Sequence, residues 1–248
     1  MSLFYIESGD TKAPLLVFLH GGGVSGWMWD KQIEHFQDYH CLVPDLPGHG
    51  QSSSIPFSIS GSAEFIAKLI EPMAQGKTVV LIGFSLGAQV ALQLLSMRPQ
   101  AFDYAIINSA LVRPIPLAKQ IIGPSIKLTH WLMKNRSFSK LQAKQLYIGK
   151  DRLENYYQET YRMKAETLIA ILQENMTFRI PEQFHQSSAK ILVTVGEKEK
   201  KMMRKSAAEI AGSNSNCKSM VIPHIGHGVT LAQPELFNKI VESWIRKP

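Results

Sequence analysis

Short apolar runs alternate with amphipathic stretches along most of the chain. Continuous apolar runs rich in Val, Ile and Leu predict strands covered on both faces, and the amphipathic stretches predict helices. We expect strands near residues 3–7, 15–19, 40–44, 78–82, 104–108, 190–195 and 218–222. We expect helices near residues 29–36, 62–73, 86–97, 201–211 and 234–245. This alternation predicts an α/β fold, with a mostly parallel twisted sheet and helices on both of its faces.

The segment 111–185 has a different pattern. It contains no convincing strand, and it is bordered by prolines at 114, 116 and 181. Helical stretches are expected in it at 119–134, 139–147 and 153–175. Because the segment lies between two predicted core strands, we interpret it as an insertion rather than as a separate domain. The predicted organisation is a core formed by residues 1–110 and 186–248, with a helical insertion at 111–185.

The pentapeptide Gly83-Phe84-Ser85-Leu86-Gly87 lies between a predicted strand and a predicted helix. A serine in this context is held on a sharp turn with its hydroxyl raised above the sheet edge. Glycines are needed on both sides because side chains there would collide with the neighbouring strand or helix. The pentapeptide alone is a weak signal, since such a serine can also serve only as a helix cap. The flanking elements make a nucleophilic Ser85 the leading interpretation.

A serine nucleophile needs a base, and the base needs an anion that fixes its orientation. His227 has a glycine on each side and lies after the last predicted strand, so its loop can bring the imidazole over the sheet edge. His224 is the main competitor for this role. Glu197 and Glu199 follow the strand that ends at Gly196, and either could supply the carboxylate. Surrounding lysines at 198, 200 and 201 could keep that carboxylate ionised, although they also fit a plain surface loop.

Four segments together resemble the α/β-hydrolase family: His20–Gly23, Asp45–Ser52, Gly83–Gly87 and Gly226–His227. The resemblance extends over nearly all of the chain, and it implies that the insertion is a helical cap, or lid, over the active site. In the family, a Gly-His pair before the final helix carries the base, which points to His227. The family usually places an aspartate three residues after the glycine that ends the penultimate strand. The matching residue here is Glu199, a departure that the order Ser, acid, His tolerates.

Two backbone amides should stabilise the oxyanion that forms when a serine attacks a carbonyl. We expect one from Leu86, the residue after the nucleophile, and one from Gly22 in the glycine-rich loop that follows the second strand. Gly23, Trp27 and Met28 could line the substrate pocket, although residues that open a helix can equally belong to the core. Three other polar residues are expected to support loops without taking part in catalysis: His20, Asp45 and His49.

Length and composition narrow the class of protein to which this chain can belong. A chain of 248 residues with 45% hydrophobic and 19% charged residues can bury one substantial core. No stretch is long and apolar enough to predict a membrane span, and no signal peptide is visible. Cys41 and Cys217 each open a predicted strand, which favours reduced thiols and a cytoplasmic location. The spacing of histidines and cysteines matches no metal site, and no nucleotide motif occurs, so no cofactor is predicted.

The net charge of +7 is unevenly distributed, because segment 111–185 contains 12 basic and 6 acidic residues. This excess fits a solvated helical surface, or attraction of an anionic substrate or surface. No nucleic-acid motif accompanies it, so that partner is not expected.

The leading hypothesis is a serine hydrolase that cleaves a carboxylic ester or thioester of a small, partly apolar substrate through an acyl-enzyme on Ser85. The alternatives are a hydrolase-like small-molecule receptor or inactive relative, and a carbon–carbon bond hydrolase or acyltransferase that uses the same residues. An interaction protein that uses the basic segment is a further possibility.

Overall fold

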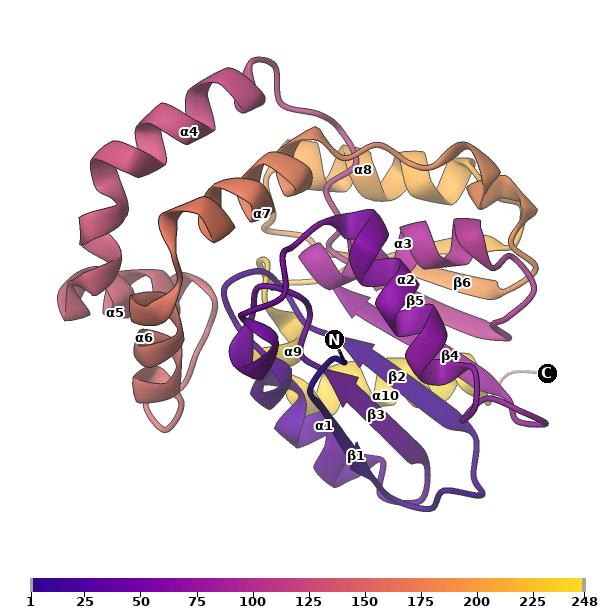
Figure 1. The fold of residues 1–248 in the computed structure, drawn as a ribbon. Coiled ribbons are helices and arrows are strands. Elements are labelled where there is room, and N and C mark those ends of the chain that lie inside the picture. The colour runs from indigo at the N-terminus through magenta and orange to yellow at the C-terminus, as the bar shows by residue number, and fades with distance from the viewer. Residues whose placement is uncertain (1, 247–248) are drawn as a thin grey trace.

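The computed structural model describes residues 2–246, which contain one seven-stranded sheet (Figure 1). Its strand order is β1-β3-β2-β4-β5-β6-β7. Only β1 pairs antiparallel with its neighbour, and every other pair of neighbours is parallel. This arrangement confirms the predicted fold class. The strands are β1 (Tyr5–Ser8), β2 (Leu15–Leu19), β3 (His40–Pro44), β4 (Val79–Phe84), β5 (Tyr104–Asn108), β6 (Lys190–Gly196) and β7 (Cys217–Ile222).

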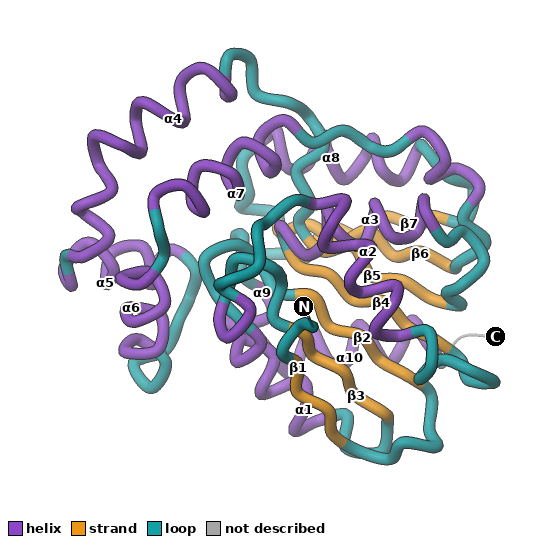
Figure 2. Tube along the Cα trace, viewed as in Figure 1, coloured by secondary structure: helices purple, strands orange, loops and turns teal. Residues whose placement is uncertain are grey.

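Helices cover both faces of the sheet (Figure 2). One face carries α2 (Ile59–Ile70), α3 (Leu86–Met97) and α8 (Lys201–Gly212), whose buried residues form one apolar cluster. The other face carries α1 (Asp30–His35), α9 (Val229–Ala232) and α10 (Pro234–Ile245), together with a 3-10 turn at Gly26–Trp29. A second short turn spans Gly50–Ser52.

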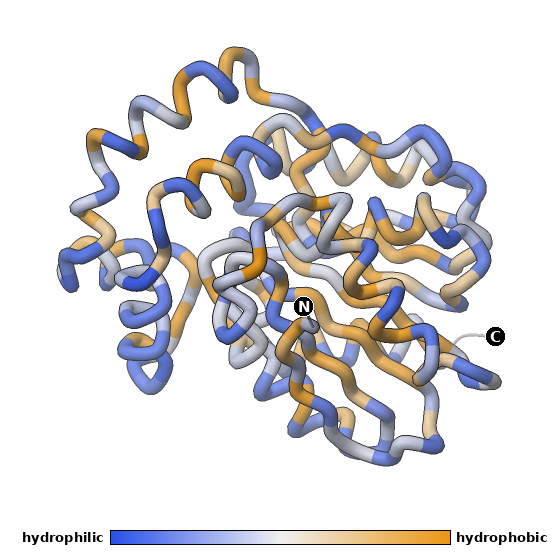
Figure 3. The backbone as a smooth tube through the Cα atoms, in the orientation of Figure 1, coloured by the Kyte–Doolittle hydropathy of each residue, from blue (hydrophilic) through white to orange (hydrophobic). Residues whose placement is uncertain are grey.

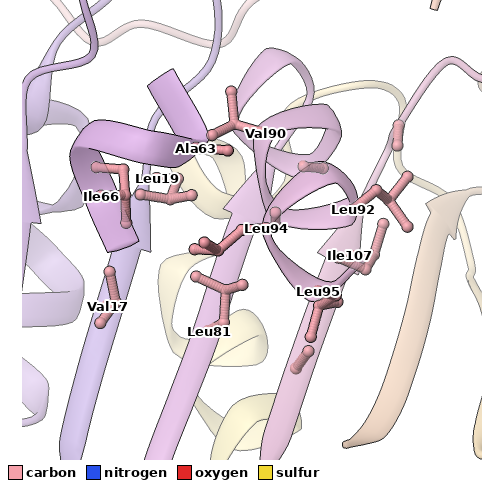
Figure 4. Close-up of a cluster of buried hydrophobic side chains, with 14 of the residues drawn as sticks. Val17, Leu19, Ala63, Ile66, Leu81, Val90, Leu92, Leu94, Leu95 and Ile107 are labelled. Atoms are coloured by element: carbon pink, nitrogen blue, oxygen red, sulfur yellow. The ribbon is translucent and has the colours of Figure 1, made fainter. Parts of the chain in front are cut away.

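The sheet is buried between these layers because successive side chains of each strand point to opposite faces. In β2, residues 15, 17 and 19 belong to one apolar cluster, whereas residues 16 and 18 belong to the other. Figure 4 shows part of the first cluster, where Val17 and Leu81 of neighbouring strands lie beneath Ile66 of α2 and Leu94 of α3. Burial on both faces explains why the strands are continuous apolar runs rather than alternating ones.

Four helices and two 3-10 turns lie between β5 and β6, and the four helices are called the inserted helices below. They are α4 (Ala118–Thr129), α5 (Arg136–Gln145), α6 (Leu153–Arg162) and α7 (Ala165–Thr177), with the turns at His130–Lys134 and Glu182–Gln186. The helix expected at 153–175 is two helices, because Met163 and Lys164 have extended backbones. The carbonyl of Met163 accepts a hydrogen bond of 2.8 Å from His130 Nε2. A long-range contact therefore stabilises a break that the local sequence does not reveal.

Cys41 and Cys217 are free, and burial raises the pKa of both thiols to about 12. Cys217 is only partly buried, and the cytoplasmic location stays a prediction. Between residues 2 and 246, no helix has the length and apolar character needed to cross a bilayer.

Candidate active site

Ser85 occupies the sharp turn between β4 and α3. Its backbone has φ 53° and ψ −111°, a strained combination for a residue other than glycine. A Cβ atom at Gly83 would lie 2.6 Å from the carbonyl oxygen of Gly87. A Cβ atom at Gly87 would lie 2.5 Å from the carbonyl oxygen of His20, at the end of β2. Both glycines are therefore required for the close approach of helix and strand that holds Ser85 in place.

Three side chains from separate loops form a continuous hydrogen-bonded chain. Ser85 Oγ lies 3.0 Å from His227 Nε2, and His227 Nδ1 lies 2.7 Å from Glu199 Oε2. An ionised carboxylate can only accept, so Nδ1 carries the hydrogen and Nε2 presents its lone pair to the hydroxyl. In this arrangement the imidazole can accept the hydroxyl proton, and the carboxylate can stabilise the imidazolium that results.

Both carboxylate oxygens of Glu199 accept hydrogen bonds. Its side chain is 1% exposed, and its Oε1 accepts hydrogen bonds from Ser109 Oγ (2.6 Å) and the Gly196 amide (2.9 Å). Burial alone would raise the pKa of Glu199, but the hydrogen bonds from His227, Ser109 and Gly196 outweigh it and hold the pKa below its usual value. The bond to Gly196 also shows how the longer side chain fits, since it bends back toward the end of β6.

The competing residues lie elsewhere. Glu197 Oε2 accepts a hydrogen bond of 2.8 Å from the amide of His224, and both side chains are at least half exposed. Ser109 was not among the residues predicted from the sequence. It directly follows the end of β5, which pairs with β6, and this position is the signal that could have identified it.

Gly22 and Leu86 are the two residues whose amides are expected to stabilise the oxyanion. Gly22 and Leu86 line the same cavity as Ser85, and a Cβ at Gly22 would lie 3.5 Å from Leu86 Cδ2. Leu86 is the first residue of α3, where helix geometry leaves the amide without an intrahelical acceptor. In the described part of the chain, neither amide donates to another acceptor. Both remain available to a ligand oxygen.

His20 supports the glycine-rich loop. Its Nδ1 donates to the carbonyl oxygen of Gly21 at 2.8 Å, and its Nε2 accepts from the amide of Leu46 at 2.9 Å. Burial lowers the pKa of His20 to about 4, so the ring is neutral at neutral pH. Asp45 likewise stabilises a turn, because its carboxylate accepts from the amides of Gly26 and Gln51. Both residues therefore hold loops, as the sequence suggested.

The cavity above Ser85 has a volume of about 300 Å³. Apart from Leu86 of α3, its apolar side chains come from residues of segment 111–185, which lie outside the segments that carry the motifs. These residues are Met133, Leu146, Tyr156, Met163, Leu168, Ile171 and Leu172. Polar lining residues from the same segment are Gln142, Gln145, Thr160 and Asn175.

Of the three pocket residues expected from the sequence, only Gly23 lines this cavity. Met28 is 2% exposed, and its sulfur accepts from the Gly21 amide at 3.4 Å, so it belongs to the core beneath the loop. Trp27 lines a second cavity of about 360 Å³, which shares Gly23 and Met163 with the first. Neither Trp27 nor Met28 lines the cavity that contains Ser85, and a place for them in the substrate pocket stays a prediction.

The second cavity is the more polar of the two. Glu159 of α6 lines it, and Ser25 Oγ donates to Glu159 Oε1 at 2.5 Å. Burial raises the pKa of Glu159, and the nearby Asp45 carboxylate raises it further, whereas the bond from Ser25 opposes the shift. Across residues 2–246, no cluster of His, Cys, Asp and Glu has the makings of a metal site.

Comparison with known proteins agrees with this geometry. The sequence pattern of the alpha/beta hydrolase family matches residues 16–240. The chain therefore belongs to the alpha/beta hydrolase family. A thermophilic esterase from Thermogutta terrifontis, solved with malate bound, superposes with a TM-score of 0.82 at 22% identity, covering 98% of this chain and 93% of the esterase. At that identity the superposition establishes the fold.

Two sequence relatives extend the comparison. An AB hydrolase superfamily protein of Gibberella zeae is 35% identical over 112 residues, which cover 43% of this chain and 39% of that protein. The (E)-2-((N-methylformamido)methylene)succinate hydrolase of Acinetobacter baylyi is 22% identical over 256 residues, covering 97% of this chain and 93% of that enzyme. The chain thus matches well under half the length of the first relative and nearly the whole length of the second.

Proposed function

We propose that this protein is a serine hydrolase that cleaves a carboxylic ester or thioester of a small, partly apolar acid. The observation that carries the proposal is the chain of hydrogen bonds from Glu199 through His227 to Ser85, which ends at an apolar cavity. Esterases among the structural neighbours support the same class of reaction.

The chemistry follows from the positions of the atoms. Ser85 Oγ attacks the carbonyl carbon while His227 Nε2 takes the hydroxyl proton, and Glu199 stabilises the imidazolium. The amides of Gly22 and Leu86 stabilise the oxyanion. When the carbon–oxygen or carbon–sulfur bond breaks, His227 returns the proton to the departing alcohol or thiol. A water molecule then loses a proton to His227 and attacks the acyl-enzyme, which releases the acid and restores the hydroxyl.

The inserted helices define the substrate in this proposal. They act as the cap predicted for segment 111–185, since α5, α6 and α7 contribute most of the cavity wall. A volume of about 300 Å³ lies at the lower end of small-molecule sites (about 300–1,000 Å³). The acyl group that fits is therefore short to medium in length and largely apolar.

The alternative hypothesis, an inactive relative or a small-molecule receptor, depends on Glu199 occupying the position where the family usually has an aspartate. Glu199 is buried, is held by Ser109 and Gly196, and still reaches His227. The departure from the family's aspartate therefore leaves the hydrogen-bonded chain intact, which favours turnover over mere binding.

The test is covalent labelling followed by turnover. Wild-type protein should react with a fluorophosphonate probe and hydrolyse p-nitrophenyl butyrate, and Ser85→Ala should do neither. Ser54→Ala, at an exposed serine outside the cavity, is the matched control and should behave as wild type. Labelling of Ser85→Ala at the wild-type rate would contradict the assignment of the nucleophile, and a labelled protein that hydrolyses no ester or thioester would favour the receptor.

A further inference from the structure

The outer side of α4 and of the turn after it carries a row of exposed apolar side chains. Leu117 is 64% exposed, Leu128 75% and Trp131 65%, and Ile121 and the exposed Pro124 lie between them. Their spacing alternates between four and three residues, which places them along one side of a helix. Isolated exposed apolar residues are ordinary, but a continuous row of this length marks an interaction surface.

The opposite side of α4 is covered by the rest of the protein. Ala118 and Ile122 are buried, and α4 packs against α7. Figure 1 shows α4 as the outermost element on that side of the molecule, and Figure 3 shows apolar and polar segments alternating along it. The exposed row, residues 117–131, is therefore a second apolar side that the fold leaves uncovered, and it is called the outer row below.

Charge identifies what could cover the outer row. Residues 104–150 contain eight basic and no acidic residues. Lys127 and Lys134 are exposed, lie one to three residues from Leu128 and Trp131, and form no ion pair within residues 2–246. Lys134 Nζ lies 5.8 Å from the ring centre of Tyr161, a contact that leaves its charge uncompensated by any carboxylate of the described residues. An apolar row flanked by lysines without ion pairs is complementary to a surface that is apolar inside and anionic outside.

A second copy of the chain would suit this surface poorly. If two outer rows packed against each other, two segments with lysines and without any acidic residue would face each other. Their like charges would repel. An anionic bilayer instead satisfies both features at once. Apolar side chains enter the boundary between headgroups and acyl chains, Trp prefers that same depth, and lysines reach the lipid phosphates.

We propose that α4 and the 3-10 turn after it dock on anionic lipid surfaces, with the outer row inserted and Lys127 and Lys134 at the headgroups. The docking does not depend on the proposed hydrolase activity, because none of these residues lines the cavity. It does place the cavity near the lipid, since Met133 lines the cavity two residues after Trp131.

Co-sedimentation of the full chain with vesicles tests the proposal. Binding should be strong to mixed phosphatidylcholine–phosphatidylglycerol vesicles, weak to pure phosphatidylcholine, and reduced by high salt. Each basic residue near an anionic surface strengthens binding about fivefold. The double variant Lys127→Glu/Lys134→Glu should therefore bind at least about tenfold more weakly than wild type. The control pair Lys68→Glu/Lys205→Glu has the same net charge, lies on α2 and α8, and should lose much less.

The apolar part is tested separately. Leu128→Ser should weaken binding to the mixed vesicles about tenfold, whereas Val221→Ser, at a residue that is 54% exposed on β7, should not. Tryptophan emission should shift to the blue on binding, and Trp131→Phe should remove most of that shift.

Absence of binding to the anionic vesicles, or equal losses in the two lysine pairs, would overturn the proposal. So would a concentration-dependent dimer that Leu128→Ser abolishes, because the row would then join two copies. Hydrolysis of a water-soluble ester should be unchanged in all these variants, which separates this test from that of the proposed function.

Discussion

The substitution Glu199→Gln tests the proposed mechanism at its most informative point, because it removes a charge and nearly preserves the shape. In the native protein Oε1 accepts from Ser109 Oγ and from the Gly196 amide. The glutamine carbonyl oxygen must take that position, since the backbone amide can only donate. The glutamine NH₂ group then faces His227 Nδ1, where Oε2 is now 2.7 Å away.

The consequence is a change of tautomer. An NH₂ group donates, so Nδ1 becomes the acceptor and the ring hydrogen moves to Nε2, the atom 3.0 Å from Ser85 Oγ. A protonated Nε2 cannot take the hydroxyl proton. Replacement of the acid by its amide in serine proteases lowers kcat about 10⁴-fold. We expect a loss in kcat/KM of the same order here, about 5 kcal/mol in the barrier.

The assay is the initial rate of p-nitrophenyl butyrate hydrolysis, with thermal unfolding as the check on folding. Glu197→Gln, two residues away on an exposed side chain, is the matched control and should keep wild-type activity. If Glu199→Gln folds normally and keeps more than about a tenth of the wild-type rate, the reasoning on the tautomer is refuted.

Three further predictions concern the frame around the site. Gly87→Ala should cost about 3 kcal/mol or prevent folding, because its Cβ would meet backbone oxygens, whereas Gly212→Ala has open space and should unfold in urea as wild type does. Burial lowers the pKa of His20 to about 4 and that of His49 to about 3, so the unfolded chain binds both protons first. Stability should be intact above about pH 6.5 and decline by at least about 3 kcal/mol as pH falls to 4. Urea titrations across that range measure it, and a flat profile would mean that His20 is not buried as a neutral ring. Leu168→Ala enlarges the cavity and should shift the preferred p-nitrophenyl ester to a longer chain, whereas Leu141→Ala, 58% exposed, should leave the preference unchanged.

The sheet could be predicted from the sequence because its strands are buried on both faces. Runs such as 15–19 and 191–193 are apolar at every position, and a doubly covered parallel strand combines that pattern with such short length. The positions of Ser85 and His227 follow from the same logic, since both come after the carboxyl ends of strands that lie in one sheet.

The cavity wall could not be predicted in the same way. Leu168 and Ile171 face the cavity because α7 packs beside α4 and over the strand ends, and that packing depends on contacts distant in sequence. For a related reason the sequence left open whether Trp27 and Met28 line the pocket or belong to the core, because the pattern of a short turn does not show which side faces the nucleophile. The bond from Ser109 to Glu199 joins residues 90 positions apart.

The two cavities share the residue Met163. It lies in the short link between the end of α6 and the start of α7. Two hydrogen bonds hold the backbone of Met163: its carbonyl accepts from His130 Nε2, and its amide donates to the carbonyl of Glu159 in α6. Because Met163 lines both cavities, a substitution at this one residue changes the walls of both.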